Sequence, residues 1–213
     1  MLRSRLAAVP LLLLTLGAGC DGLLSPRTQV SLQDAELALV HVADDAPELL
    51  AQELTFWAVR GEEREAEIRY ASAGGYNGKC LRFVVPAEAL LRREDGSVIQ
   101  PGDSVQIRVR VVDPRLYVFE FDPGGLRFDP AHPARIEVRY SWAAADIDDD
   151  GDVDDADEEM AKTMAIWRQE DEGDPWTKVP TTRLEELQEV HAEITGFTKY
   201  ALASDRQGSR ASF

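Results

Sequence analysis

The sequence predicts a mainly β protein, an antiparallel β-sandwich with one short helix that follows an inserted acidic loop. From Leu54 onward, apolar residues mostly alternate with polar ones, which is the period of half-buried strands. Turn sequences such as Asp95-Gly96 and Pro101-Gly102 separate these runs. Many short strands at turn-marked intervals are typical of two packed antiparallel sheets.

Two stretches, 105–111 and 135–142, alternate most regularly, and each predicts a strand with one solvated face. The residues expected to be buried are Val105, Ile107, Val109, Ile136, Val138, Tyr140 and Ile194. The residues expected to be exposed are Gln106, Arg108, Glu137 and Arg139. Further strands are predicted at 54–59, 64–71, 80–85, 116–121, 163–168, 176–179, 189–195 and 198–203. A helix is predicted from Asp154 to about Met164.

These elements define one domain of residues 46–204, in which 144–164 form the inserted loop and its helix. Residues 1–19 are predicted to be a removed signal segment, and 20–45 a tether with a poorly defined N-terminal segment. Between 30 and 50 the pattern allows a strand, a helix or both. The tail at 205–213 is predicted to be disordered.

The N-terminus has the layout of a secretory signal, because Arg3 and Arg5 precede an apolar run at 6–16 and small residues then lead to Cys20. This run is far shorter than the ~20 residues of a membrane-spanning helix. The ending is similar to the lipobox of bacterial lipoproteins, although Gly17 stands where that motif usually has leucine. The resemblance implies cleavage before Cys20, lipid on its thiol, and a cell-envelope protein held to a membrane outside the cytoplasm. The alternative is a plain signal peptide that leaves a soluble protein with a free Cys20.

Charge and cysteine content narrow the possible partners and chemistry. The net charge is -16, and 146–174 alone contain 14 acids and two bases, so nucleic acid is not an expected partner. Lipid on Cys20 would leave Cys80 as the single thiol, which excludes an intrachain disulfide. Cys80 opens an apolar run and is therefore expected to be a small buried residue.

The acidic stretch 146–157 carries the one motif with chemical content. It has aspartate at the first, third, fifth, ninth and twelfth places and glycine at the sixth. Calcium takes six to eight oxygen ligands, and glycine at the sixth place permits a sharp turn. The pattern resembles the EF-hand loop and, because aspartate closes it, the dockerin variant. The resemblance implies a calcium site formed by the carboxylates of Asp146, Asp148, Asp150, Asp154 and Asp157 and by the backbone carbonyl of Asp152.

The motif also departs from those families. An EF-hand has a helix on both sides, whereas here a strand-like segment ending at Trp142 enters the loop. Dockerins carry two repeats and one is found here, so cohesin binding is not implied. Val153, at the eighth place, is expected to hold the loop against its neighbours, and the alternative for the whole stretch is a solvated acidic loop.

A wider resemblance covers 53–204. The runs 81–90 (LRFVVPAEAL), 121–130 (FDPGGLRFDP), 134–140 (ARIEVRY) and 194–202 (ITGFTKYAL) are similar to the sandwich domain of ankyrins, netrin receptors and zonula occludens proteins. This resemblance implies an interaction and packing module and no enzyme. Its motifs are apolar and turn residues, so they carry no chemistry of their own.

Three functions follow from these patterns. The first is a membrane-anchored, calcium-stabilised binding or structural module of the envelope, with a protein or glycan partner. The second is a carbohydrate-associated accessory lipoprotein, which a row of exposed aromatic side chains would support. The third is an unrecognised hydrolase, for which the sequence offers no nucleophile or metalloprotease motif.

Overall fold

A computed structural model describes residues 29–71 and 78–206. The predicted signal segment, Cys20 and the tail from 207 onward lie outside the described residues. Among the described residues, no helix is both long and apolar enough to cross a membrane.

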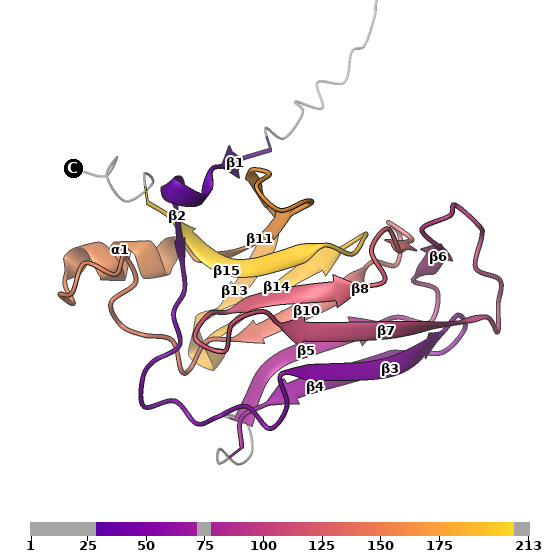
Figure 1. Cartoon of the computed structure of the whole chain (residues 1–213), viewed down its shortest axis with the longest axis horizontal. Helices are drawn as coiled ribbons and strands as arrows, with labels where there is room; N and C mark the ends of the chain where they lie inside the picture. Colours follow the sequence, from indigo (N-terminus) through magenta and orange to yellow (C-terminus); the bar gives the residue numbers. More distant parts are fainter. Residues whose placement is uncertain (1–28, 72–77, 207–213) are drawn as a thin grey trace, which may run out of the picture.

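Two antiparallel sheets make up the domain (Figure 1). The larger sheet has eight strands, in the order β1 (Ser31–Leu32), β12 (Trp176–Lys178), β11 (Ala165–Gln169), β15 (Lys199–Asp205), β8 (Val118–Asp122), β7 (Ser104–Val111) and β3 (Glu53–Val59), with β2 (Leu37–Leu39) also paired to β15. The second sheet has five, in the order β13 (Thr181–Leu184), β14 (Glu189–Ile194), β10 (Ala134–Arg139), β5 (Lys79–Val85) and β4 (Arg64–Arg69). A small ribbon joins β6 (Leu90–Arg92) to β9 (Arg127–Phe128).

Aromatic side chains from both sheets meet in the core. The ring of Phe83 on β5 lies 5.1 Å from that of Phe121 on β8, and 5.6 Å from that of Phe197. These rings are almost completely buried, as are Phe128 and Tyr200. Contact between the inner faces of two sheets confirms the predicted sandwich.

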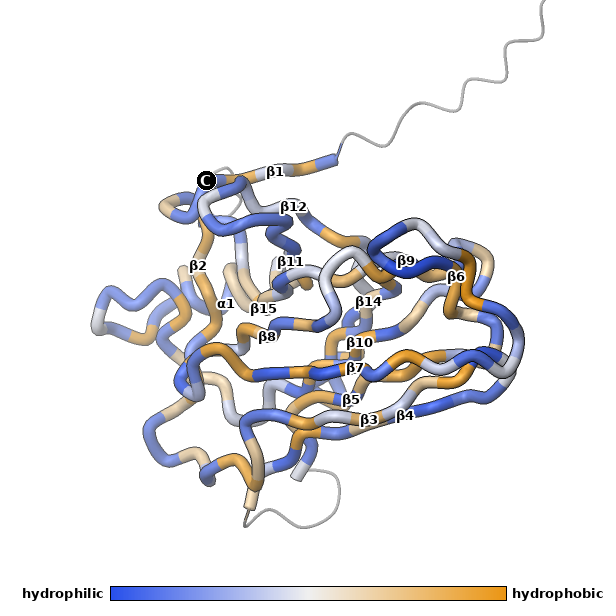
Figure 2. Tube along the Cα trace, turned by 45° about the vertical axis from the view of Figure 1, so that its right-hand side comes forward, coloured by the Kyte–Doolittle hydropathy of each residue, from blue (hydrophilic) through white to orange (hydrophobic). Residues whose placement is uncertain are grey.

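The N-terminal segment covers part of the outer face of the larger sheet. After β1 comes a short 3-10 helix, η1 (Asp34–Glu36), and then β2, which Figure 2 shows as a hydrophobic strand beside β15. Leu37 packs there with the buried Trp167 and Trp176, and the Trp176 indole Nε1 donates to Asp34 Oδ1 at 2.6 Å. The ambiguous N-terminal pattern is therefore a strand, a 3-10 turn and a strand.

The single α-helix of the described residues, α1 (Asp155–Thr163), lies at one end of the sandwich beside β15, where the sequence predicted a helix (Figure 1). A further 3-10 turn, η3 (Glu185–Leu187), precedes β14. Cys80 is buried as predicted, and burial raises the pKa of its thiol to about 12. It is therefore a protonated core residue at neutral pH.

Most burial predictions are confirmed. Val105, Ile107, Val109, Ile136, Val138 and Ile194 are buried, Gln106 and Arg108 are exposed, and Tyr140 is half-buried against the core. The prediction for Glu137 and Arg139 is wrong, because only 4% and 6% of their surfaces are exposed. The register places Arg82 and His191 on either side of Glu137, and it places Glu189 opposite Arg139. The long side chains beside Glu137 and Arg139 cover both residues and form ion pairs with them. The outer face of this sheet therefore buries polar groups.

Candidate metal centre

The acidic loop leaves the second sheet after β10 and ends in α1. Its anchor is Ile147, which is 5% exposed and belongs to the main core together with Met160 of α1. Ser204 of β15 fixes the helix by donating its hydroxyl to the Met160 carbonyl at 2.8 Å. The prediction that Val153 holds the loop is wrong, since 68% of that side chain is exposed. The residue that faces the core is Ile147, at the second place of the loop.

Asp157 closes the loop from the first turn of α1. Its Oδ1 accepts from the backbone N–H of Ile147 at 2.6 Å and of Asp148 at 3.3 Å, and its Oδ2 accepts from that of Asp154 at 2.9 Å. Asp154 caps α1, because its Oδ1 accepts from the Ala156 N–H at 2.7 Å, and its side chain also accepts from the Asp157 N–H, which completes a capping box with the bond from the Asp154 N–H to Asp157. Burial by itself would raise the pKa of Asp157, but the N–H groups of Asp154, Ile147 and Asp148 outweigh it and lower that pKa.

The first half of the loop wraps around Asp146. The carboxylate of Asp146 accepts from the N–H groups of Asp150 at 3.2 Å and Gly151 at 3.0 Å. Gly151 has a φ of 95°, in the left-handed region that favours glycine, as its place in the motif predicts. Asp150 Oδ1 accepts from the Asp152 N–H at 3.0 Å, which continues the turn.

Three of the six predicted ligands converge. Asp146, Asp148 and Asp157 each offer a carboxylate oxygen, and these oxygens lie within 4.8 Å of one another. Asp148 Oδ1 is buried and has no hydrogen-bond partner. Burial raises the pKa of Asp148, and the charges of Asp150 and Asp157 raise it further. The group has the character of a cation site, in which buried oxygens repel one another until a positive charge lies between them.

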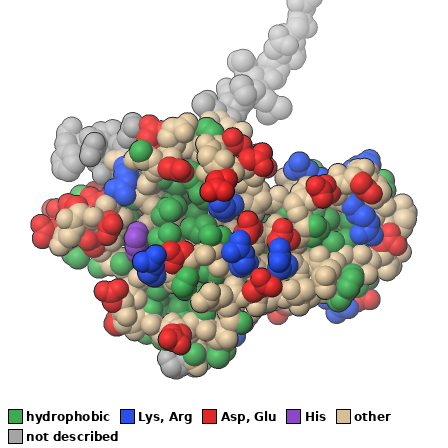
Figure 3. Space-filling view, viewed as in Figure 1, with side chains coloured by type: hydrophobic (Ala, Val, Ile, Leu, Met, Phe, Trp, Pro, Cys, Tyr) green, Lys and Arg blue, Asp and Glu red, His purple; other side chains and the backbone are tan. Residues whose placement is uncertain are grey.

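The other three predicted ligands lie outside this group. Asp150, Asp152 and Asp154 are exposed, and the carboxylate of Asp154 caps α1. Figure 3 shows acidic side chains gathered over the end of the molecule that holds α1. Asp150 and Asp154 would therefore have to turn inward to reach a bound ion.

A second group with metal-ligating side chains was missed by the sequence analysis. Glu137, Glu189 and His191 come within the same 4.8 Å limit on the outer face of the five-stranded sheet. Glu189 and His191 are two residues apart on β14, so their side chains point to the same face of the sheet. Glu137 lies beside them only because the register pairs β10 with β14. The register itself could not be read from the sequence.

The surroundings of the two groups differ in charge. In the second group, Lys79 Nζ lies 2.8 Å from Glu189 Oε1, and Arg135 Nε lies 2.8 Å from Glu137 Oε1. Arg139 and Arg82 add two more cations at 3.2 and 3.3 Å. The ion pairs of the described residues include no lysine or arginine partner for the carboxylates of Asp146, Asp148 or Asp157. Arg206 Nη1 does donate to the Asp148 backbone carbonyl at 2.9 Å, so the difference lies in the carboxylates, which in the loop have no ion-pair partner.

No known family model, curated protein or solved structure matches the chain. The likeness to the ankyrin, netrin-receptor and zonula occludens domain and the likeness to the EF-hand and dockerin loops stay predictions. Either group of side chains could hold a metal ion, and the fold is a mainly β sandwich.

Proposed function

We propose that the loop 146–157 binds one calcium ion, and that the domain is a calcium-stabilised binding or structural module of the cell envelope. The observation that carries this proposal is the uncompensated group of Asp146, Asp148 and Asp157 with the unpartnered, buried Asp148 Oδ1. Its donors are all carboxylate oxygens, which favours a hard cation over zinc or copper. A loop with many possible oxygens suits calcium, which takes six to eight ligands, better than magnesium, which demands near-ideal octahedral geometry.

The ligand set extends from the preformed group. Asp146, Asp148 and Asp157 supply the first oxygens, Asp150 and Asp154 turn inward, and Asp152 contributes its backbone carbonyl. The ion relieves the mutual repulsion of the carboxylates, so binding tightens a loop that is held to the core by Ile147. Apart from Ile147, the core of the sandwich is built from residues outside the loop, and it persists without the ion.

Thermal unfolding tests the calcium site. An unpaired loop closed by aspartate is expected to bind with a dissociation constant of about 10 to 100 µM. At roughly 1 mM free calcium this adds about 1.4 to 2.7 kcal/mol to the free energy of unfolding. The melting temperature of the wild type should therefore rise by several degrees on replacing chelator with calcium.

The matched variants decide whether this loop is responsible. Asp146→Asn with Asp148→Asn should abolish the calcium-dependent rise. The control Asp171→Asn, on a separate exposed acidic turn, should keep it. A wild type indifferent to chelator, or a double variant that still gains stability from calcium, would leave the stretch as a solvated acidic loop.

We further propose that lipid on Cys20 holds the domain to a membrane. Expressed with its own leader, the protein should fractionate with membranes, and Cys20→Ser should release it or leave it unprocessed. A processed Cys20→Ser protein in the membrane pellet would contradict anchoring through this residue.

The partner is proposed to be another envelope protein or a glycan. Crosslinking the lipidated protein in its native envelope and identifying a reproducible partner would test this. Among the described tryptophans Trp57 is 57% exposed, whereas Trp167 and Trp176 are buried and Trp142 is half-buried. A single exposed ring on the edge strand β3 is not the row of aromatics that a carbohydrate platform would need, so the described residues favour a protein partner.

A further inference from the structure

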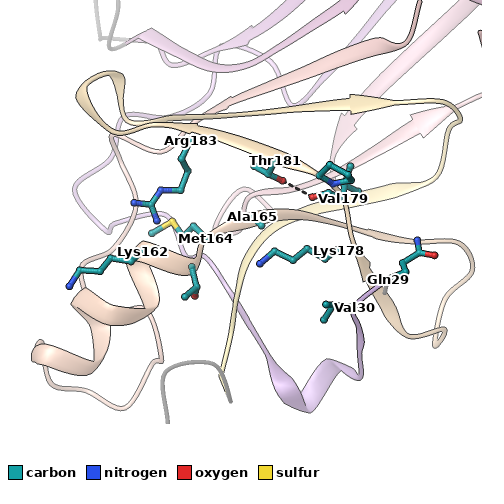
Figure 4. A pocket seen from close by; sticks show the side chains of 11 residues that line it. Gln29, Val30, Lys162, Met164, Ala165, Lys178, Val179, Thr181 and Arg183 are labelled. Carbon is teal, nitrogen blue, oxygen red and sulfur yellow. Dashed lines mark hydrogen bonds between the residues drawn. The ribbon is translucent and has the colours of Figure 1, made fainter. Parts of the chain in front are cut away.

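A groove of about 840 Å³ lies at the edge of the larger sheet. It runs between the end of α1, the first residues of β11 and the connection from β12 to β13 (Figure 4). Its volume lies in the range of small-molecule sites. The groove shares no residue with the candidate metal centre.

The charge of this groove is opposite to that of the chain. Three of its lining residues, Lys162, Lys178 and Arg183, are cations, and no aspartate or glutamate lines it, although the chain has a net charge of -16. Lys162 pairs with Glu159 at 2.6 Å, and Arg183 pairs with Glu185 and donates to the Ala161 carbonyl. These contacts hold both side chains at the margin of the groove.

Lys178 supplies the uncompensated charge. Its ammonium lies 5.6 Å from the centre of the Trp167 ring, which faces it across the β11–β12 pair. The ion pairs of the described residues give it no carboxylate partner. Figure 4 shows Lys178 reaching from β12 on the side of β11 where Val30 lies, while Arg183 reaches toward Met164 from β13 on the other side. An anion that enters this space meets a half-buried ammonium, where a charge-assisted hydrogen bond is stronger than at an open surface.

The remaining lining is largely apolar. On the face of the sheet that carries Lys178, the groove is lined by Ala165, which is buried in the same cluster as Trp167, and by Val30, which is 43% exposed and whose carbonyl accepts from the Lys178 N–H at 2.9 Å. Met164 and Val179 line the groove from the other face, where they belong to the main core. The hydroxyl of Thr181 is already engaged, since it donates to the Val179 carbonyl and accepts from the Ile166 N–H. The groove therefore offers one charged contact beside an apolar surface, which fits a ligand with an anionic head and an apolar body.

We propose that this groove binds a small amphipathic anion, with its carboxylate or phosphate head against Lys178 and its apolar body against Val30 and Ala165. The site adds a ligand to the function proposed above and does not depend on calcium.

Two fluorescent probes of similar shape test the charge requirement. Anilinonaphthalene sulfonate carries an anionic head, and N-phenyl-naphthylamine has the same aromatic body without it. Binding is titrated with the full chain. All variants are prepared in the same way, so that probe bound at other places adds the same background fluorescence to each titration. For Lys178→Gln, we expect the dissociation constant of the sulfonate probe to rise about tenfold. Lys178→Arg should bind the sulfonate probe about as tightly as the wild type does. The neutral probe should bind the wild type and Lys178→Gln equally.

The matched control is Lys199→Gln, because Lys199 lines a separate groove of about 280 Å³ on the outer face of the larger sheet. This variant should bind the sulfonate probe as the wild type does. The proposal is overturned if Lys178→Gln leaves sulfonate binding unchanged, if Lys199→Gln weakens it instead, or if both probes weaken equally. Competition experiments then show whether the ligand is a free amphiphile or a membrane lipid. Decanoate in solution should displace the sulfonate probe if the ligand is a free amphiphile. Displacement only by phosphatidylglycerol vesicles would assign the site to a membrane lipid, and displacement by neither would overturn it.

Discussion

Asp157 holds the acidic loop to α1 even before any ion binds, and Asp157→Ala should therefore destabilise the metal-free protein. The substitution removes an acceptor that is 4% exposed and that takes three backbone N–H groups. The donor on Ile147 is itself buried and would lose its acceptor. Leaving a buried donor unsatisfied costs about 1 to 3 kcal/mol, and losing a helix cap contact costs about 1 kcal/mol. Because the other two donors can turn to water, we expect a total loss of about 2 to 4 kcal/mol in chelator.

Denaturant titration in chelator and in calcium measures this loss. Asp157→Ala should be destabilised in both conditions, since it removes the hydrogen bonds and also one predicted ligand. Asp155→Ala is the matched control, because Asp155 lies in the same first turn but is exposed. Its free energy of unfolding should change by less than about 0.5 kcal/mol in chelator. If Asp157→Ala behaves like this control, the hydrogen bonds of Asp157 do not hold the loop.

Three other outcomes are expected. Ile147→Ala should cost about 2 to 4 kcal/mol of stability, whereas Val153→Ser should be neutral within about 0.5 kcal/mol, and equal effects in denaturant titration would contradict the assignment of Ile147 as the anchor. Gly151→Ala should cost about 1 kcal/mol in chelator, because alanine is strained at a φ of 95°; an unchanged midpoint would refute this. Burial by itself would raise the pKa values of Glu137 and Glu189, but the cations beside these carboxylates outweigh it and lower both values. The two carboxylates therefore stabilise the fold above the unfolded pKa of about 4.3, and this stabilisation is lost as the pH falls through the folded pKa. The stability gap between wild type and Glu189→Gln should accordingly shrink from pH 6 to pH 3, and a constant gap would contradict it.

The sequence predicted the sandwich well where side chains obey a simple alternation. β7 and β10 were expected from their period, and β5, β14 and β15 from short apolar runs between turns. The alternation on β10 gives the wrong prediction for Glu137 and Arg139, because polar residues in such a pattern are expected to face water. Burial of such residues depends on which strands lie beside β10, and strand order is a long-range property that local pattern does not contain.

Some short strands were missed or left open for a physical reason. β13 carries Thr181 and Thr182 with little apolar content, and it is a strand because it pairs with β14. At 30–50 the sequence left strand and helix open, and β1 and β2 are strands there because they pair with β12 and β15 and cover Trp167 and Trp176. Such segments take their structure from tertiary contacts and not from their own propensity.

The loop was predicted more fully than its anchoring. Spacing alone identified Asp146, Asp148 and Asp157 and the turn at Gly151, because the chemistry of a cation site fixes residue types at fixed places. The same spacing assigned the anchoring role to Val153, since the families it resembles use that place for packing. In this sandwich the entering segment is not a helix, and Ile147 faces the core instead.

Calorimetric titration of calcium into the metal-free protein measures whether the loop 146–157 binds an ion. We expect one ion per chain with a dissociation constant of about 10 to 100 µM, much weaker binding of magnesium, and no binding to Asp146→Asn with Asp148→Asn. Retained binding in that double variant together with loss in Glu189→Gln would move the site to the second group. The absence of any calcium binding at about 1 mM would show that the loop is not a calcium site.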